Sequence, residues 1–584
     1  MPDTSSSPSP SLARTALSSV REAWRAGRRW LIATAVLQLA LALLPALQVV
    51  LVAHALATMA TPSTAWPSML GLAAVVGIAF PLGQCATAAT QRLALRMRLA
   101  YQLLALEYVA AAEPAALASP ATIEAAQTAH EAAATVDTVA GDVVRLAGSA
   151  VTAVALSVAV VAINPFAGLL VLASLVPTVW VFTRIARAEE AGWPKVGAAE
   201  RRAQYAAEQL LQQRTGTELA TLGSSWKVVE LAHNWRREAV RILDDLMAVA
   251  MRWEAVSGVL TALLLAGALM VLLLGEPSPA AAAAALTGTI SGLHATRNVG
   301  YAVGGIVTAA PRMSAIDACR ARPVHATVNI TSPAYTLSAR GITVRYPGTA
   351  AKAVDQASIS ATRGEMIAIV GPNGAGKSTL VNALLGVVPA EGTVEIDGVD
   401  VSASASRDRI GHFGLLTQEF GRYEFTVREN VALGHPGTVA DKAIAQALAQ
   451  AHAARLVARL PRGLDSQLGQ QWHGTGLSGG QWQRLALARI HLRNAGIWIL
   501  DEPTSAIDAE TEEAIFAELH SQRAQRITVV VSHRAWTLRA MDRVYVMDEG
   551  RIVQQGSYDE LLRTPGRFAE IFALQTRSAG EGTR

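Results

Sequence analysis

Six long apolar segments in the first 320 residues restrict what this part of the chain can fold into. They cover residues 29–60, 67–91, 140–163, 165–186, 248–275 and 280–311. A helix needs about 20 residues to cross the core of a bilayer, and each segment is at least that long. The sixth segment is the least apolar, because glycines interrupt it and it contains His294, Arg297 and Asn298. The sequence therefore predicts an all-α membrane domain with six spans.

The positive charges around these segments predict their orientation. The expected outer turns at 61–67, 164–165 and 275–279 contain no Lys or Arg, whereas arginines gather at the opposite ends of the segments. Those arginines lie within residues 25–29, 92–98, 184–187 and 236–241. Because cytoplasmic loops carry an excess of Lys and Arg, we expect both termini in the cytoplasm. The first segment is too long for the core of a secretory signal and is expected to remain as a span of the cell (plasma) membrane.

Two polar stretches of several tens of residues separate the second from the third segment and the fourth from the fifth. A helix rises about 1.5 Å per residue, so these stretches are expected to extend well beyond the membrane. Pro114 and Pro120 break the first stretch, and Gly223-Ser224-Ser225 breaks the second. Each stretch is therefore predicted to be a pair of helices joined by a cytoplasmic turn.

The start of the chain differs in composition from the apolar segments. Met1 to Ser11 is rich in Ser and Pro, which is typical of disorder. We assign residues 1–22 to a disordered tail, 23–322 to the membrane domain and 323–584 to a second domain.

The second domain contains a pattern that predicts phosphate binding. It comes after the apolar run Met366–Val370, fits G-x-x-x-x-G-K-[ST] and consists of Gly371, Pro372, Asn373, Gly374, Ala375, Gly376, Lys377, Ser378 and Thr379. Glycines let the backbone curl so that consecutive N–H groups point at a polyphosphate at the start of a helix. Lys377 would reach the outer phosphates, and the Ser378 hydroxyl would hold Mg²⁺.

Two further motifs occur about a hundred residues later. The first is Leu477-Ser478-Gly479-Gly480-Gln481, and the second is the apolar run from Ile497 that ends in Asp501 and Glu502. The apolar run predicts a buried parallel strand ending in one carboxylate for a Mg²⁺ shell and one to orient or deprotonate an attacking water. Together the motifs resemble the nucleotide-binding domain of ATP-binding cassette (ABC) proteins, over residues 335–575.

The resemblance implies roles for further residues. Tyr346 matches the aromatic that stacks on adenine, and Gln418 matches the glutamine that contacts Mg²⁺ and senses the γ-phosphate. Asp508 lies in the loop that communicates across a dimer, and His533 matches the histidine at the γ-phosphate. The resemblance thus implies ATP and Mg²⁺ as cofactors, with Glu502, His533 and Lys377 catalytic, Ser378, Gln418 and Asp501 at the metal, and Ser478, Gly479, Gly480 and Gln481 binding ATP from a second copy.

The whole chain resembles an ABC half-transporter of the exporter type. This implies a membrane all-α domain, with six transmembrane helices and long cytosolic extensions, fused to an α/β P-loop ATPase domain of ABC type. The turns near Glu113–Thr122 and Leu219–Glu230 are implied to dock on the ATPase. The expected function is ATP-driven export by a dimer, favoured to be a homodimer, with two composite sites that drive alternating access. The substrate could be a peptide, a lipid or a hydrophobic small molecule.

Several alternatives stay open on sequence. One is an importer that uses the exporter fold for a siderophore-like substrate, and another is one half of a heterodimer. The six spans and the absence of a basic stripe argue against a soluble ABC ATPase acting on nucleic acid or ribosomes, and the intact catalytic motifs argue against a regulatory or channel role. Residues 470–476 depart from the acidic loop usual in exporters, so the coupling contacts are open.

Polar side chains inside the apolar segments are costly in a bilayer, and each either lines the transport pathway or forms hydrogen bonds between helices. They are Gln38, Gln48, His54, Gln84, Asp142, Arg145, His294 and Arg297.

Overall fold

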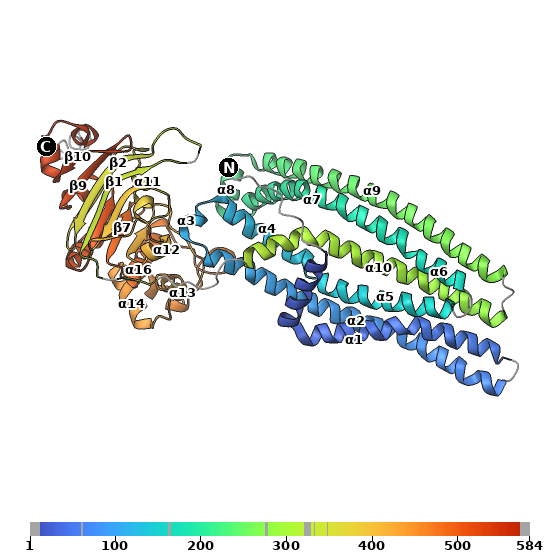
Figure 1. The fold of residues 1–584 in the computed structure, drawn as a ribbon. Helices are drawn as coiled ribbons and strands as arrows, with labels where there is room; N and C mark the ends of the chain where they lie inside the picture. The colour runs from blue at the N-terminus through green and yellow to red at the C-terminus, as the bar shows by residue number, and fades with distance from the viewer. Residues whose placement is uncertain are drawn as a thin grey trace. The chain divides into compact units, whose positions relative to one another are not determined.

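The computed structural model describes residues 12–59, 62–161, 165–274, 278–320, 329–331, 333–346 and 348–572. The chain forms two compact units, Met1–Ala110 with Ile123–Pro323 and Ala111–Thr122 with Val324–Arg584 (Figure 1). The predicted domain boundary at 322/323 lies outside the described residues, as do parts of the three expected outer turns.

The first unit is entirely helical where it is described, and α7 and α9 run side by side (Figure 1). Its helices are α1 (Leu12–Ala57), α2 (Pro62–Ala111, whose last residue belongs to the second unit), α4 (Pro120–Val136, whose first three residues belong to the second unit), α5 (Val139–Val161), α6 (Pro165–Ala173), α7 (Leu175–Leu211), α8 (Gln213–Thr221), α9 (Ser225–Leu274) and α10 (Pro279–Arg320). Several begin with proline, which suits the first helical position because its missing N–H has no partner there and its φ is already helical.

The described residues contain five helical stretches that are long and apolar enough to cross a membrane. They correspond to the first five predicted segments. The sixth predicted segment also forms a helix, α10, but it is not among these five. The glycines and polar residues of α10 lower its hydropathy.

The start of α1 corrects the prediction of a disordered tail over residues 1–22. The helix begins at Leu12, so residues 12–22 are helical, and residues 1–11 lie outside the described part. Thr15, Ser19 and Ala23 recur at a spacing of four, and each is at most 1% exposed. Small side chains on one helix face allow close packing, but they carry little hydrophobic signal in a sequence.

The second unit contains two sheets. The four-stranded sheet has the order β2-β1-β4-β5 and the six-stranded sheet has the order β10-β9-β3-β8-β7-β6. The strands are β1 (Thr336–Val344), β2 (Val354–Thr362), β3 (Met366–Val370), β4 (Glu391–Ile396), β5 (Val399–Asp400), β6 (Phe413–Leu416), β7 (Ile497–Asp501), β8 (Ile527–Val531), β9 (Arg543–Asp548) and β10 (Arg551–Gly556).

Helices connect and cover these strands. They are α3 (Pro114–Leu117), α11 (Lys377–Leu384), α12 (Ser406–Ile410), α13 (Val427–Ala432), α14 (Asp441–Gln450), α15 (Ala454–Ala458), α16 (Gly479–Arg493), α17 (Ala509–Ser521), α18 (Ala535–Arg539) and α19 (Tyr558–Arg563), with the short 3₁₀ turns Gly463–Asp465, Gln470–Trp472 and Arg523–Gln525.

The centre of the six-stranded sheet positions the predicted site. Strand β3 is buried along its whole length and runs parallel to β8 and β9, while β7 runs parallel to β6 and β8. Apolar runs are what strands buried on both faces require. Because carboxyl ends of parallel strands meet at one edge, the segments after β3, β6, β7 and β8 lie together there.

The turn after α2 belongs to the second unit. The Arg407 side chain donates to the carbonyls of Ala111 and Ala112, and the Ser406 hydroxyl donates to Glu113 Oε2 at 3.2 Å. The first of the two expected turns therefore contacts the unit that carries the phosphate-binding loop. The second, between α8 and α9, lies in the helical unit, and its docking stays a prediction.

Candidate nucleotide-binding site

The loop between β3 and α11 is tightly curled. Gly374 and Gly376 have φ of +82° and +96°, in the left-handed region that favours glycine. A Cβ on Gly371 would lie 2.1 Å from the carbonyl oxygen of Met547, so only glycine fits there. Lys377, the first residue of α11, donates from Nζ to the carbonyls of Gly371 and Pro372 at 2.8 and 2.9 Å. The loop thus places a lysine and a helix N-terminus together, as an anion-binding site requires.

A carboxylate pair ends β7 beside this loop. Asp501 accepts a hydrogen bond from the Ser378 side chain, so the loop and the strand end are in contact. Burial and, second, the charge of Glu502 raise the pKa of the Asp501 carboxyl above its ordinary value. Burial lowers the pKa of the Lys377 ammonium, while Asp501 and Glu502 oppose that shift. Charges of both signs are therefore concentrated at this edge of the sheet.

Glu502 contacts both predicted γ-phosphate sensors. His533 Nδ1 lies 2.9 Å from Glu502 Oε1, and Gln418 Nε2 donates to Glu502 Oε2 at 3.3 Å. Glu502 has φ of +47°, which non-glycine residues rarely adopt and which clusters at functional sites. The structure therefore brings Gln418, Glu502 and His533 together as the sequence predicted, although their roles stay predictions.

The predicted adenine-binding residue lies beside the end of the loop motif. The Tyr346 hydroxyl is 3.3 Å from Thr379 Oγ1, and 41% of Tyr346 is exposed. An exposed ring beside the phosphate loop is available for stacking on a base.

The Ser478 segment begins helix α16. Ser478 is exposed and caps the helix, because its hydroxyl accepts from Gln481 N and its own N–H donates to Gln481 Oε1 at 2.8 Å. A Cβ on Gly480 would lie 2.5 Å from the carbonyl oxygen of Ala506. Asp508 caps α17 by accepting from Thr511 N at 3.0 Å. No hydrogen bond or ion pair joins residues 371–379 to 478–481 in the described part of this chain.

Comparisons with known proteins agree with this geometry. Residues 354–505 match the family model described as "ABC transporter". The chain is 41% identical over 242 residues to the ATP-dependent lipid A-core flippase of Aromatoleum aromaticum, covering 41% of this chain and 40% of the relative. It is 40% identical over 253 residues to the flippase of the same name from Pseudomonas fluorescens, covering 42% and 41%. The chain thus spans about two fifths of the length of the curated relatives that it matches.

A solved structure resembles nearly the whole chain. It is that of a bacterial Atm1-family ABC exporter with ATP bound, with a TM-score of 0.80 and 22% identity over 94% of this chain and 98% of the other. The chain therefore has the fold of an ABC exporter. Its second unit is the C-terminal nucleotide-binding domain, which confirms the predicted fold class.

Two side chains that the sequence reasoning missed support the site of this nucleotide-binding domain. Gln483, on α16, is 1% exposed; its Nε2 donates to the Glu502 carbonyl at 3.0 Å, and its Oε1 accepts from Ala506 N at 3.1 Å. This amide therefore connects α16 to the backbone of Glu502. Gln483 stands two residues after Gln481, but nothing in the sequence indicates that its side chain is buried.

Glu512, on α17, is the second missed residue. It is 2% exposed, accepts a hydrogen bond from the Thr504 hydroxyl and forms an ion pair with Arg534. Thr504 lies two positions after Glu502, and Arg534 comes directly after His533. A buried carboxylate thus connects the segments after β7 and β8 in the nucleotide-binding domain. In the sequence, an acidic residue in the first turn of a helix is too common to suggest this.

Proposed function

We propose that this chain is one half of an ATP-driven exporter, in which ATP binding and hydrolysis drive alternating access of the membrane domain. The observation that carries the proposal is the convergence of Lys377, Asp501, Glu502 and His533 at the carboxyl edge of the six-stranded sheet. A phosphate-binding lysine, a buried carboxylate and a carboxylate held by a histidine are the groups that phosphoryl transfer to water needs.

Each residue has a distinct role in this proposal. Lys377 binds the β- and γ-phosphates as a point charge, and His533 contacts the γ-phosphate. Glu502 orients the attacking water or accepts its proton. Its contacts with His533 and Gln418 hold its two carboxylate oxygens, so the carboxylate is positioned before the nucleotide arrives. Tyr346 stacks on adenine.

The residues at this edge fit Mg²⁺. Proteins bind this ion through one or two carboxylates together with substrate phosphates, and Asp501 and the Ser378 hydroxyl offer oxygens in contact with each other. The Gln418 carbonyl is a third oxygen, since its amide nitrogen is the atom that bonds Glu502. When bound, the ion would neutralise charge on the phosphates.

The site is proposed to be completed by a second copy of the chain. The exposed α16 N-terminus, with Ser478, Gly479 and Gly480, offers N–H groups and a partial positive charge suited to a γ-phosphate. We favour a homodimer because this chain carries the full set of catalytic residues, Asp508 included. The nucleotide-binding domain and both termini are placed in the cytoplasm of a cell-membrane protein.

The membrane domain is proposed to carry the substrate outward. The relatives named as lipid A-core flippases match over only about two fifths of this chain, the part with the ATPase. They therefore support the ATPase function more strongly than the identity of the substrate. A lipid or another amphiphile is the substrate class that this similarity favours, ahead of a peptide.

Replacing Glu502 with Gln tests the proposal. In the full chain, purified and reconstituted in lipid vesicles, the variant should bind ATP but lose hydrolysis, because the carboxylate acts on the water and not on the nucleotide. The neighbouring exposed Glu510, replaced in the same way, is the control and should keep the wild-type rate. Turnover of E502Q at the wild-type rate would remove Glu502 from catalysis, and absence of turnover in the wild type would contradict the function.

A further inference from the structure

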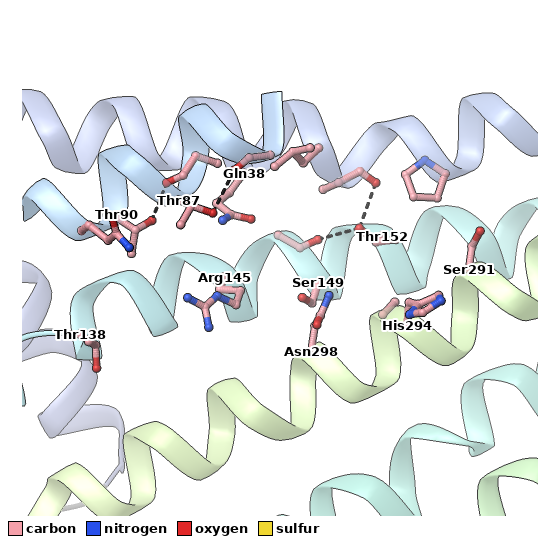
Figure 2. Close-up of a pocket in the computed structure, with 18 of the residues that line it drawn as sticks. Gln38, Thr87, Thr90, Thr138, Arg145, Ser149, Thr152, Ser291, His294 and Asn298 are labelled. Atoms are coloured by element: carbon pink, nitrogen blue, oxygen red, sulfur yellow. Dashed lines mark hydrogen bonds between the residues drawn. The ribbon is translucent and has the colours of Figure 1, made fainter. Parts of the chain in front are cut away.

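The helical unit contains a cavity of about 740 Å³ between α1, α2, α5 and α10 (Figure 2). More than half of its lining residues have polar side chains, although all of these except Thr138 lie on helices of the membrane domain. Its size falls within the range of small-molecule sites. Polar groups in such helices are costly and mark pathways or binding sites. Of the eight polar residues singled out in the sequence, Gln38, Arg145 and His294 line this cavity.

Hydrogen bonds divide the polar lining into two groups. The hydroxyls of Thr87 and Thr90 donate to backbone carbonyls of their own helix at 3.0 and 2.9 Å, and the Thr152 hydroxyl donates to the Ala42 carbonyl of α1 at 3.0 Å. The side-chain amides of Gln38 and Asn298 form no hydrogen bond with other described residues, and Figure 2 shows them on α1 and α10 at the cavity. Amide donors left without protein partners are available to a ligand or to water.

Arg145 is the only Lys or Arg in the lining, and no carboxylate lines the cavity among the described residues. Its Nη1 lies 3.3 Å from Asp142 Oδ1. Asp142 itself is packed away from the cavity, because a Cβ on Gly305 of α10 would lie 2.8 Å from its Oδ2. The Arg145 side chain is 41% exposed and that of Asp142 is 12% exposed. The Asp142 carboxylate thus contacts the Arg145 guanidinium on the side away from the cavity. The remaining guanidinium N–H groups can face the cavity.

We propose that this cavity binds the anionic group, a carboxylate or a phosphate, of the transported substrate. Arg145 pairs with the anion, since a guanidinium can donate two parallel hydrogen bonds to a carboxylate or to a phosphate. The side-chain amides of Gln38 and Asn298 donate to the remaining oxygens of the anion. The inference rests on the proposed transport function, because it makes this cavity part of the substrate route. A lipid headgroup and a soluble organic anion share this chemistry.

The charge of the cavity can be measured without transport or ATP. Thr87 is exposed and lines the cavity, so the T87C variant places a thiol there; Cys85→Ala removes the exposed native thiol, and Cys319 is buried. The full chain in phosphatidylcholine nanodiscs is reacted with an anionic and with a cationic methanethiosulfonate. Arg145→Gln should lower the anionic-to-cationic rate ratio by about tenfold, which corresponds to the loss of one charge nearby.

Two control variants make this result specific. Arg145→Lys keeps the charge and should keep the ratio. Arg297→Gln removes an arginine of α10 that does not line the cavity and lies near the Tyr301 ring, and it should also leave the ratio unchanged. An unchanged ratio in Arg145→Gln, or an equal fall in Arg297→Gln, would overturn the assignment of the cavity charge to Arg145.

Protection of the T87C thiol then tests binding and its source. Dihexanoylphosphatidylglycerol tests a lipid headgroup, glycerol 3-phosphate tests a soluble anion, and dihexanoylphosphatidylcholine is the control without net charge. Protection by either anionic probe that is lost in Arg145→Gln supports the proposal and identifies the source. No protection by either probe, or protection that persists in Arg145→Gln, overturns it. None of these measurements needs ATP hydrolysis. A failure of the anion-site proposal can therefore be distinguished from a failure of the proposed ATPase function.

Discussion

His533 Nδ1 lies 2.9 Å from Glu502 Oε1, although the two residues come after different strands. Strands β7 and β8 are parallel neighbours, so their ends bring the carboxylate and the imidazole to the same place. The main chain adds to this link, since Glu502 N donates to the Val531 carbonyl at 2.9 Å. The pair is therefore positioned by the sheet itself.

This contact predicts the effect of His533→Ala. The variant should lower kcat by about 100-fold or more, the usual cost of losing one transition-state contact, with little change in ATP affinity. Affinity should persist because Lys377 and the loop backbone remain. His520→Ala, on α17 outside the site, is the matched control. ATP turnover and equilibrium binding are measured on the full chain, and a normal kcat in His533→Ala would exclude a catalytic contact.

Glu512 is predicted to position the segments around the site. Glu512→Ala leaves the buried Thr504 hydroxyl and the half-exposed Arg534 without their partner, which should cost about 2 kcal/mol of stability. Because Arg534 is adjacent to His533, kcat should fall more than ATP affinity. Glu513→Ala removes the exposed carboxylate next to it and should change neither. Thermal unfolding and kinetics check both effects, and equal behaviour of the two variants would contradict the role.

The ease of prediction differed between the parts of this site. Strand β3 spans the predicted Met366–Val370, and β7 ends at Asp501, because strands buried on both faces need unbroken apolar runs. Lys377 lies in a glycine-rich motif and Glu502 ends an apolar run, so both could be predicted from the motifs and from their resemblance to ABC proteins. Gln483 and Glu512 were missed because a polar residue on a helix is usually solvated, and only packing shows that these two are buried.

Packing also explains the wrong prediction at the start of the chain. Residues 12–22 have few large apolar side chains, so the sequence favoured disorder. In the fold, small residues such as Ser19 pack on one face of α1. The cavity around Arg145 combines residues from four helices, and no local pattern in the sequence brings them together.

A buried histidine predicts a loss of stability in acid. Burial is the main cause that lowers the pKa of His491 to about 3, while its ring packs edge-on against Trp498 at 4.8 Å. The unfolded chain, with a histidine pKa near 6.5, binds more protons between about pH 3 and 6.5. The stability from neutral His491 is therefore present above pH 6.5 and is lost as the pH falls towards 3.

Thermal unfolding of the full chain at pH 7.5 and 5.5 tests this sign. The wild-type Tm should fall more on acidification than that of His491→Gln, which does not titrate. His435→Gln, an exposed histidine, should behave as the wild type does. Identical pH dependence in all three proteins would show that His491 does not contribute.

The central claim is that each ATP site is shared between two chains, and pairing of variants in mixed dimers tests it most directly. Differently tagged full-length chains are purified as pairs and their ATPase activity is measured in lipid vesicles. A chain with Glu502→Gln paired with a chain with Ser478→Arg should be active, because one shared site carries both lesions and the other carries none. A chain with both substitutions paired with a wild-type chain should be nearly inactive, because each site then has one lesion. The reverse result, an inactive first pair and an active second pair, would place each complete site within one chain and contradict the account.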